Sequence, residues 1–152
     1  MKYITLLGEG GMIWIIFAVI LICTKKYRKC GLMMGAALLL MLVINDGILK
    51  NLIARPRPFN RFDPADPAMF AVWKDFPFPE IVSRPSSFSF PSGHTSSSFA
   101  AALPMLKTDK KIGIPALVLA FLIGFSRIYV HVHYPTDVIL SLIHISEPTR
   151  PY

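Results

Sequence analysis

The chain has 152 residues, of which 53% are hydrophobic and only 16% are charged. The length is typical of one domain, but a mean hydropathy of +0.52 is too high for an ordinary soluble domain and indicates a membrane protein with several spans. The net charge of +7 does not indicate nucleic-acid binding, because many of the basic residues lie in short clusters between apolar runs. That pattern sets membrane topology instead.

Two apolar runs come first, and a basic turn separates them. Residues 11–23 (GMIWIIFAVILIC) are expected to form the first span. Residues 32–53 are expected to form the second, which at ~1.5 Å per residue crosses a hydrocarbon core of about 30 Å. The turn TKKYRK lies between Cys23 and Cys30, which we interpret as free thiols because disulfides are rare on a cytoplasmic flank.

A long irregular loop is expected over residues 54–91, because eight of the thirteen prolines lie there and proline ends helices. Its interleaved Phe and Trp residues favour the level of the lipid headgroups. The third span, residues 95–106, is rich in small residues, which permit close helix packing in lipid. A second basic turn, KTDKK, leads to a fourth span at residues 112–125, and a fifth helix is expected from Pro135. The predicted fold is an all-α membrane bundle of about five spans, the last truncated, with a proline- and aromatic-rich extracytoplasmic loop.

Membrane orientation follows from the basic turns. Two spans separate TKKYRK from KTDKK, so both turns are expected on the same side, which the positive-inside rule makes cytoplasmic. The long loop and the stretch SRIYVHVHYPTD, residues 126–137, are then expected together on the extracytoplasmic side.

Three polar clusters fall on this outer side, each at the end of a different apolar run. They are KNLIARPRP with Lys50 and Arg57, FPSGHTS with Ser92, Gly93 and His94, and SRIYVHVHYPTD with Arg127, His133 and Asp137. Guanidinium forks, a lysine ammonium and the free N–H groups of a helix that begins at Ser92 are donors suited to phosphate. The clusters together predict a phosphate site.

In this order the clusters resemble the motifs of the type-2 phosphatidic acid phosphatase superfamily. Lys50 to Pro58 meet K-x6-RP, Pro91 to His94 meet PSGH, and Ser126 to Asp137 meet SR-x5-H-x3-D. That superfamily also includes vanadium-dependent haloperoxidases and bacterial undecaprenyl-diphosphate phosphatases. The resemblance covers about residues 1–139. Any one motif alone is weak, but three in order on one membrane face form a strong signal.

The resemblance implies the catalytic roles. His133 fits the motif spacing and His131 does not. His133 would attack phosphorus and form a phosphohistidine, while Asp137, four residues on, would hold the ring in the required tautomer. His94 would protonate the leaving oxygen and then activate water.

The resemblance also implies how the phosphate is held. Lys50, Arg57 and Arg127 would bind the equatorial oxygens, where charge sits in the transition state. Ser92 and Gly93 would add a hydroxyl and backbone donors. These cations take the role that metal ions have in other phosphatases, so no metal and no cofactor are implied.

The implied protein is an integral membrane lipid phosphatase of a bacterial plasma membrane, with its active site on the extracytoplasmic side. Its partners are a lipid phosphate substrate and membrane lipids, without nucleic acid, and the oligomeric state stays open. Undecaprenyl diphosphate is the first expectation for the substrate, because short bacterial members of this appearance often serve cell-wall lipid recycling.

Several alternatives remain. Phosphatidic acid or phosphatidylglycerophosphate would suit the same phosphate motifs. Vanadate-dependent halide oxidation uses the same pocket, although relatives of that kind are usually larger and soluble. An inactive, truncated fragment or a membrane scaffold with a dead site is the non-catalytic alternative.

Other charged residues have simpler interpretations. His131 is interpreted as a packed or interfacial residue. Asp46 precedes Lys50 by four residues, which favours an ion pair within the helix. Arg55 is left between a substrate or headgroup contact and a solvated charge. The remaining loop charges match neither a phosphate motif nor a metal-ligand spacing: Arg61, Arg84, Asp63, Asp66, Asp75 and Glu80.

Both ends of the chain depart from the pattern. The C-terminal LSLIHISEPTRPY has polar residues and prolines where lipid-facing residues belong, and it resembles the in-frame translation of a transposase adapter used in sequencing libraries. We therefore divide the chain into a membrane phosphatase domain at residues 1–139 and a suspected non-native tail at residues 140–152. Met1 is interpreted as an internal methionine of a longer chain.

The adapter interpretation predicts that raw nucleotide reads contain adapter DNA directly after the codons for residue 139 or 140. Reads that continue without the adapter would contradict it.

Overall fold

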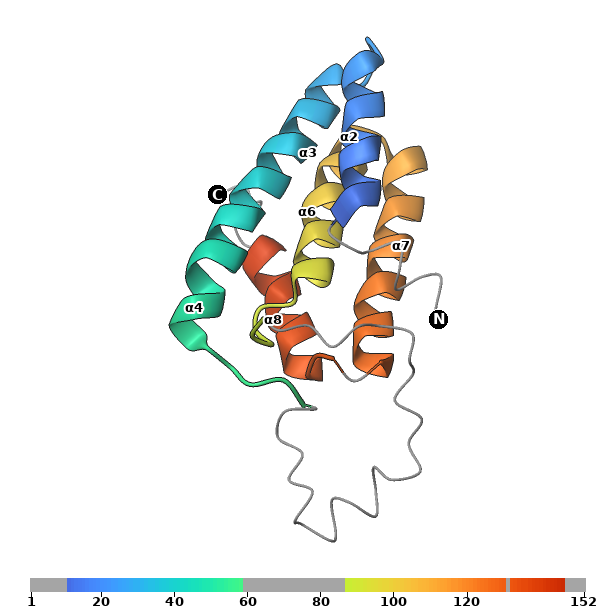
Figure 1. The fold of residues 1–152 in the computed structure, drawn as a ribbon. Helices are drawn as coiled ribbons and strands as arrows, with labels where there is room; N and C mark the ends of the chain where they lie inside the picture. Colours follow the sequence, from blue (N-terminus) through green and yellow to red (C-terminus); the bar gives the residue numbers. More distant parts are fainter. Residues whose placement is uncertain (1–10, 59–86, 131, 147–152) are drawn as a thin grey trace, which may run out of the picture.

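The computed structural model describes residues 11–58, 87–130 and 132–146, and all its regular elements in these ranges are helices (Figure 1). The elements are α2 (Met12–Cys23), α3 (Arg28–Met41), the π-helix η2 (Leu42–Leu49), α4 (Lys50–Ile53), α6 (Gly93–Thr108), α7 (Lys110–Tyr129) and α8 (Pro135–Ser146). The predicted all-α fold is confirmed for these residues. Most of the predicted long loop, residues 59–86, lies outside the described part.

Two of the helices are long and apolar enough to cross a membrane. One is the continuous run Arg28–Ile53, formed by α3, η2 and α4, and the other is α7. They coincide with the predicted second and fourth spans. Helix α2 is apolar but has only 12 residues, and residues 1–10 before it lie outside the described part.

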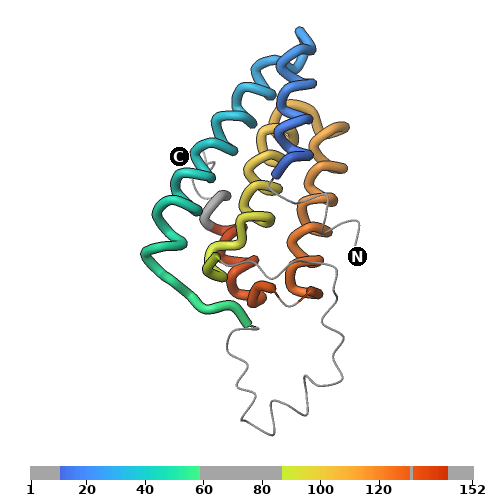
Figure 2. Tube along the Cα trace, in the orientation of Figure 1, coloured from blue at the N-terminus to red at the C-terminus, as the bar shows by residue number. Residues whose placement is uncertain are grey.

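Helix α6 lies at the centre of the bundle and contacts α2, α3, α7 and α8 (Figures 1 and 2). Its buried face consists mostly of small residues: Thr95, Ser96, Ser97, Ser98, Ala100, Ala101 and Ala102. Large apolar side chains such as Ile15, Val118 and Phe121 are instead exposed on the outer helices. Small residues inside and large apolar residues outside are the arrangement expected of helices packed in lipid, as the sequence predicted.

A buried hydrogen bond joins α2 to α6 at the centre. The Trp14 indole Nε1 donates to Ser98 Oγ at 3.0 Å, and Ser98 Oγ donates to the His94 carbonyl at 2.7 Å. The serines of α6 therefore serve helix packing. Cys23 and Cys30 are both free thiols, as predicted.

The two basic turns lie at the same end of the bundle. The Tyr27 hydroxyl, in the first turn, donates to Asp109 Oδ2 at 2.8 Å, in the second. Asp109 also caps α7 by accepting from the Lys111 N–H at 2.9 Å. Helix α4 ends and α8 begins at the opposite end (Figure 1). The predicted separation of the basic turns from the polar clusters is therefore confirmed, although the second turn is only one residue long.

The close crossing of α6 and α7 depends on Gly113, where an added Cβ would lie 2.1 Å from Leu106 Cα. We expect Gly113→Ala to destabilise the chain by ~1–3 kcal/mol or more, because the backbones would have to separate. A Cβ on Gly35 would meet no atom within 4 Å. Gly35→Ala should therefore leave stability unchanged or raise it by up to ~1 kcal/mol. Thermal unfolding in detergent measures both, and equal melting temperatures would contradict the crossing.

Candidate active site

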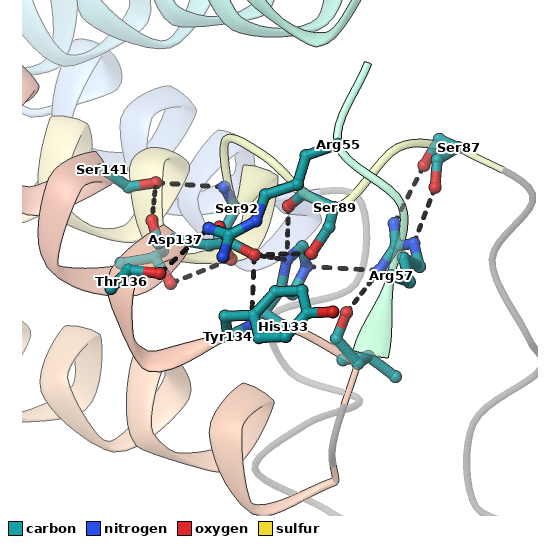
Figure 3. Close-up of polar contacts among 12 residues, drawn as sticks. Arg55, Arg57, Ser87, Ser89, Ser92, His133, Tyr134, Thr136, Asp137 and Ser141 are labelled. Atoms are coloured by element: carbon teal, nitrogen blue, oxygen red, sulfur yellow. Dashed lines mark hydrogen bonds and ion pairs between the residues drawn. The ribbon is translucent and has the colours of Figure 1, made fainter. Parts of the chain in front are cut away.

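The three polar clusters converge where the segment after α4, the start of α6 and the α7–α8 connection meet (Figure 3). Arg57, Arg127 and His133 are 3%, 2% and 4% exposed. Burying two guanidinium groups beside an imidazole is costly, so the surrounding contacts decide what these groups can do.

Arg57 is fixed by main-chain and hydroxyl acceptors. Its Nε donates to the Ser87 carbonyl at 2.6 Å, its Nη2 contacts Ser87 Oγ at 3.0 Å, and its Nη1 donates to the Val132 carbonyl at 3.0 Å. Nη1 also lies 3.4 Å from His133 Nε2. Burial lowers the pKa of Arg57, and the charge of Asp137 acts in the opposite direction. The guanidinium is thus held beside the imidazole nitrogen.

The tautomer of His133 follows from one contact. Its Nδ1 lies 2.6 Å from the Ser89 carbonyl oxygen, which can only accept. Nδ1 therefore carries the proton, and in the neutral ring Nε2 keeps its lone pair on the side of Arg57. Burial lowers the pKa of His133 well below its usual value, and the charges of Arg57 and Arg127 lower it further. The site therefore holds a neutral imidazole whose unprotonated Nε2 faces Arg57.

Asp137 lies close to His133, as predicted, but not within hydrogen-bond distance. The gap from His133 Nδ1 to Asp137 Oδ2 is 3.9 Å. The carboxylate is fully buried and accepts instead from Arg55 Nη1 at 2.5 Å, Ser89 Oγ at 2.5 Å and the Tyr134 N–H at 3.1 Å. The contact with Tyr134 also caps the start of α8.

Lys50 reaches the start of α6 from the neighbouring helix. It forms the predicted ion pair with Asp46, and its ammonium lies 3.9 Å from the position that a Cβ on Gly93 would take. Gly93 is the first residue of α6, so the ammonium lies near that helix's free N–H groups. Ser92 stands at the N-cap position of α6 without a side-chain capping hydrogen bond, is fully buried and accepts from Thr95 Oγ1 at 3.0 Å.

Partly buried His94 lies in the first turn of α6. Its carbonyl accepts from Ser98 Oγ at 2.7 Å, and it directly follows Gly93, whose Cβ position lies 3.9 Å from the Lys50 ammonium. The structure therefore brings together side chains from all three predicted clusters.

Sequence reasoning missed the serines and the partner of Arg55. Ser87 and Ser89 lie before α6 and belong to no motif. Arg55 pairs with Asp137, donates to Thr136 Oγ1 at 2.9 Å and lies 4.2 Å over the Tyr134 ring, and the sequence interpretation included none of these partners. The available signal was electrostatic: a carboxylate predicted in an apolar bundle requires a cation.

Some predicted assignments lie outside the structure's described ranges. They are those of His131, Arg61, Arg84, Asp63, Asp66, Asp75 and Glu80. Within residues 11–58, 87–130 and 132–146, no group of three His, Cys, Asp or Glu side chains could hold a metal ion. The division of the chain at residue 139 stays a prediction, because helix α8 continues to Ser146 without deciding where native sequence ends.

Comparison with known proteins identifies the family. The model of the PAP2 superfamily matches residues 26–144, so the chain belongs to that superfamily, as its motifs predicted. An undecaprenyl-diphosphatase of Sulfolobus acidocaldarius is 30% identical over 128 residues, which cover 84% of this chain and 55% of the relative. A decaprenylphosphoryl-5-phosphoribose phosphatase of Mycobacterium tuberculosis is 34% identical over 137 residues, which cover 89% of this chain and 67% of that one.

The fold is also similar to a solved membrane protein. The crystal structure of a transmembrane PAP2-type phosphatidylglycerolphosphate phosphatase from Bacillus subtilis matches with a TM-score of 0.62 and 26% identity, covering 98% of this chain and 76% of that one. The chain thus spans about half the length of the Sulfolobus relative and three quarters of the solved structure.

The lowered pKa of His133 predicts that acid destabilises the fold. An unfolded imidazole titrates near ~6.5 and the folded one lower, so the unfolded chain takes up the proton first as pH falls. Wild-type melting temperature should therefore decrease below about pH 6.5. His133→Gln should show a weaker decrease in this window, because glutamine does not titrate. Parallel decreases in the two proteins would contradict the buried, neutral imidazole.

Proposed function

We propose that the chain is the catalytic part of an integral membrane lipid phosphatase that acts through a phosphohistidine intermediate. The observation that carries the proposal is the geometry of His133. Its Nδ1 donates to the Ser89 carbonyl, and its unprotonated Nε2 accepts from Arg57 Nη1 at 3.4 Å. A nucleophilic lone pair beside a guanidinium suits attack on a phosphorus atom whose oxygens the guanidinium binds.

The reaction proceeds in two displacements. In the first, His133 Nε2 forms a bond to phosphorus while the bond from phosphorus to the leaving oxygen breaks, and His94 gives that oxygen a proton. In the second, His94 takes a proton from water, the water oxygen bonds to phosphorus, and the phosphorus–nitrogen bond breaks. Phosphate leaves and His133 returns to its neutral Nδ1–H tautomer, while Asp137 stabilises the positive ring formed in between.

The cations supply the electrostatic stabilisation. Arg57 and Arg127 are both buried, and Lys50 approaches the N-terminus of α6. Together with Ser92 and Gly93 they hold the equatorial oxygens, where charge accumulates during phosphoryl transfer. This arrangement supports the expectation of a reaction without a metal ion.

The surroundings of the site favour a lipid substrate. A pocket of about 350 Å³ lies between η2–α4 and α8, next to Ser92. Leu49, Ile53, Phe90 and Pro91 line one part of it, with Asn45 as a polar member. Leu140, Ser141 and Ile143, which belong to the suspected tail at residues 140–152, line the α8 side. A headgroup at the phosphate site could therefore keep its apolar tail beside the helices, entering from the outer leaflet.

Undecaprenyl diphosphate is the proposed substrate. Two of the relatives described above carry polyprenyl lipids in their names, an undecaprenyl-diphosphatase and a decaprenylphosphoryl-5-phosphoribose phosphatase. The alternative is a glycerophospholipid phosphate, supported by the fold's similarity to a phosphatidylglycerolphosphate phosphatase. The proposed location is a bacterial plasma membrane with the site extracytoplasmic, because the basic turns lie at the opposite end of the bundle.

The test measures phosphate release from undecaprenyl diphosphate and from phosphatidic acid in lipid vesicles containing EDTA. Wild type should release phosphate, and His133→Ala should lose activity by about 10³-fold or more, because the nucleophile is removed. His131→Ala is the matched control and should retain activity, because His131 lies outside the motif.

A longer version of the chain with complete terminal helices is assayed in parallel. Activity of that version alone would identify this chain as an inactive fragment with a correct site. If neither version releases phosphate, the proposed phosphatase function is contradicted.

A further inference from the structure

Asp137 belongs to a closed ring of hydrogen bonds with Arg55 and Ser89 (Figure 3). Arg55 Nη1 donates to Asp137 Oδ1 at 2.5 Å, and Ser89 Oγ donates to Asp137 Oδ2 at 2.5 Å. The ring closes through the main chain, where the Ser89 N–H donates to the Arg55 carbonyl at 2.8 Å. Each of the three residues therefore contacts the other two.

Ser89 also connects this ring to the imidazole. Its carbonyl accepts from His133 Nδ1 at 2.6 Å, whereas the nearest carboxylate oxygen of Asp137 lies 3.9 Å from the same nitrogen. Two hydrogen bonds therefore fix Ser89: its N–H donates to the Arg55 carbonyl, and its side chain donates to Asp137. Its carbonyl, which sets the tautomer of His133, cannot move without disturbing the ring.

We propose that Arg55 and Ser89 are positioning residues for the reaction. Arg55 neutralises the buried Asp137, Ser89 Oγ donates to it, and together they hold the Ser89 carbonyl against His133, so that Nε2 presents its lone pair to phosphorus. This inference rests on the proposed phosphatase function and adds two residues that none of the three motifs contains.

The contacts of Arg55 favour positioning over substrate binding. Its Nη1 is shared between Asp137 and Thr136 Oγ1, and its guanidinium lies 4.2 Å over the Tyr134 ring. Figure 3 shows Arg55 against Asp137 and Tyr134, whereas Arg57 lies against Ser87 and His133. The two arginines of the RPRP segment thus have separate roles, one with the carboxylate and one with the nucleophile.

The test compares Arg55→Gln, Asp137→Asn and the double variant by steady-state kinetics with the substrate that wild type hydrolyses. Arg55→Gln should lower kcat about tenfold or more and change KM less than about twofold, because the positioned nucleophile is disturbed but no substrate contact is lost. The double variant should be no more than about twofold slower than Asp137→Asn, because the two side chains act as one unit.

Three further variants sharpen the result. Arg55→Lys should recover part of kcat, since an ammonium can still donate to Asp137. Ser89→Ala keeps the carbonyl but loses the hydroxyl, and should also lower kcat without raising KM. Thr136→Val removes only the exposed partner of Arg55 and should remain within about twofold of wild type.

If Arg55→Gln raises KM but leaves kcat unchanged, and its effect multiplies with that of Asp137→Asn in the double variant, Arg55 is a substrate contact. That result would overturn the positioning role. If Arg55→Gln has the same kcat and KM as an active wild type, the positioning role is also overturned, but the proposed phosphatase function is not. If wild type releases no phosphate from any substrate, the function fails instead. Thermal unfolding of the same variants then tests the ring. Stability losses of Arg55→Gln and Asp137→Asn that are not additive in the double variant support the ring, and additive losses overturn it.

Discussion

The buried carboxylate of Asp137 is the constraint on which the arrangement of the site depends. A charge placed in an apolar bundle costs several kcal/mol unless it is paired and hydrogen-bonded. Its partners come from the segment after α4, the segment before α6 and the start of α8. Satisfying one carboxylate therefore draws three distant parts of the chain together, and those parts carry the three polar clusters.

The packing of α6 makes this convergence possible. Its serine and alanine face lets neighbouring backbones approach closely, and Gly113 on α7 permits the tightest crossing. The same helix presents its N-terminus, with Ser92 and Gly93, beside Lys50. Small residues in the bundle core thus serve the site indirectly, because they fix the helix whose free N–H groups are the proposed phosphate donors.

Sequence predicted the side chains of the site better than the contacts among them. Motif spacing selected His133, Asp137 and Arg57, and helical spacing predicted the pair of Asp46 with Lys50. The π-helix before Lys50 was missed, since η2 has no composition that distinguishes it from an ordinary apolar helix. The Ser89 carbonyl was missed for a different reason: every residue has a carbonyl, so its contact with His133 depends on tertiary position alone.

The distribution of charge distinguishes Arg57 from the cations that form ion pairs with a carboxylate. Lys50 has Asp46 and Arg55 has Asp137, whereas the hydrogen bonds of Arg57 described above all involve neutral groups. The positive charge of Arg57 is therefore available to an anion that binds beside His133. In the free site the same charge, with burial and Arg127, lowers the pKa of His133 and keeps Nε2 unprotonated. A bound phosphate would offset these cations, which favours the positive charge that the ring acquires when Nε2 bonds to phosphorus.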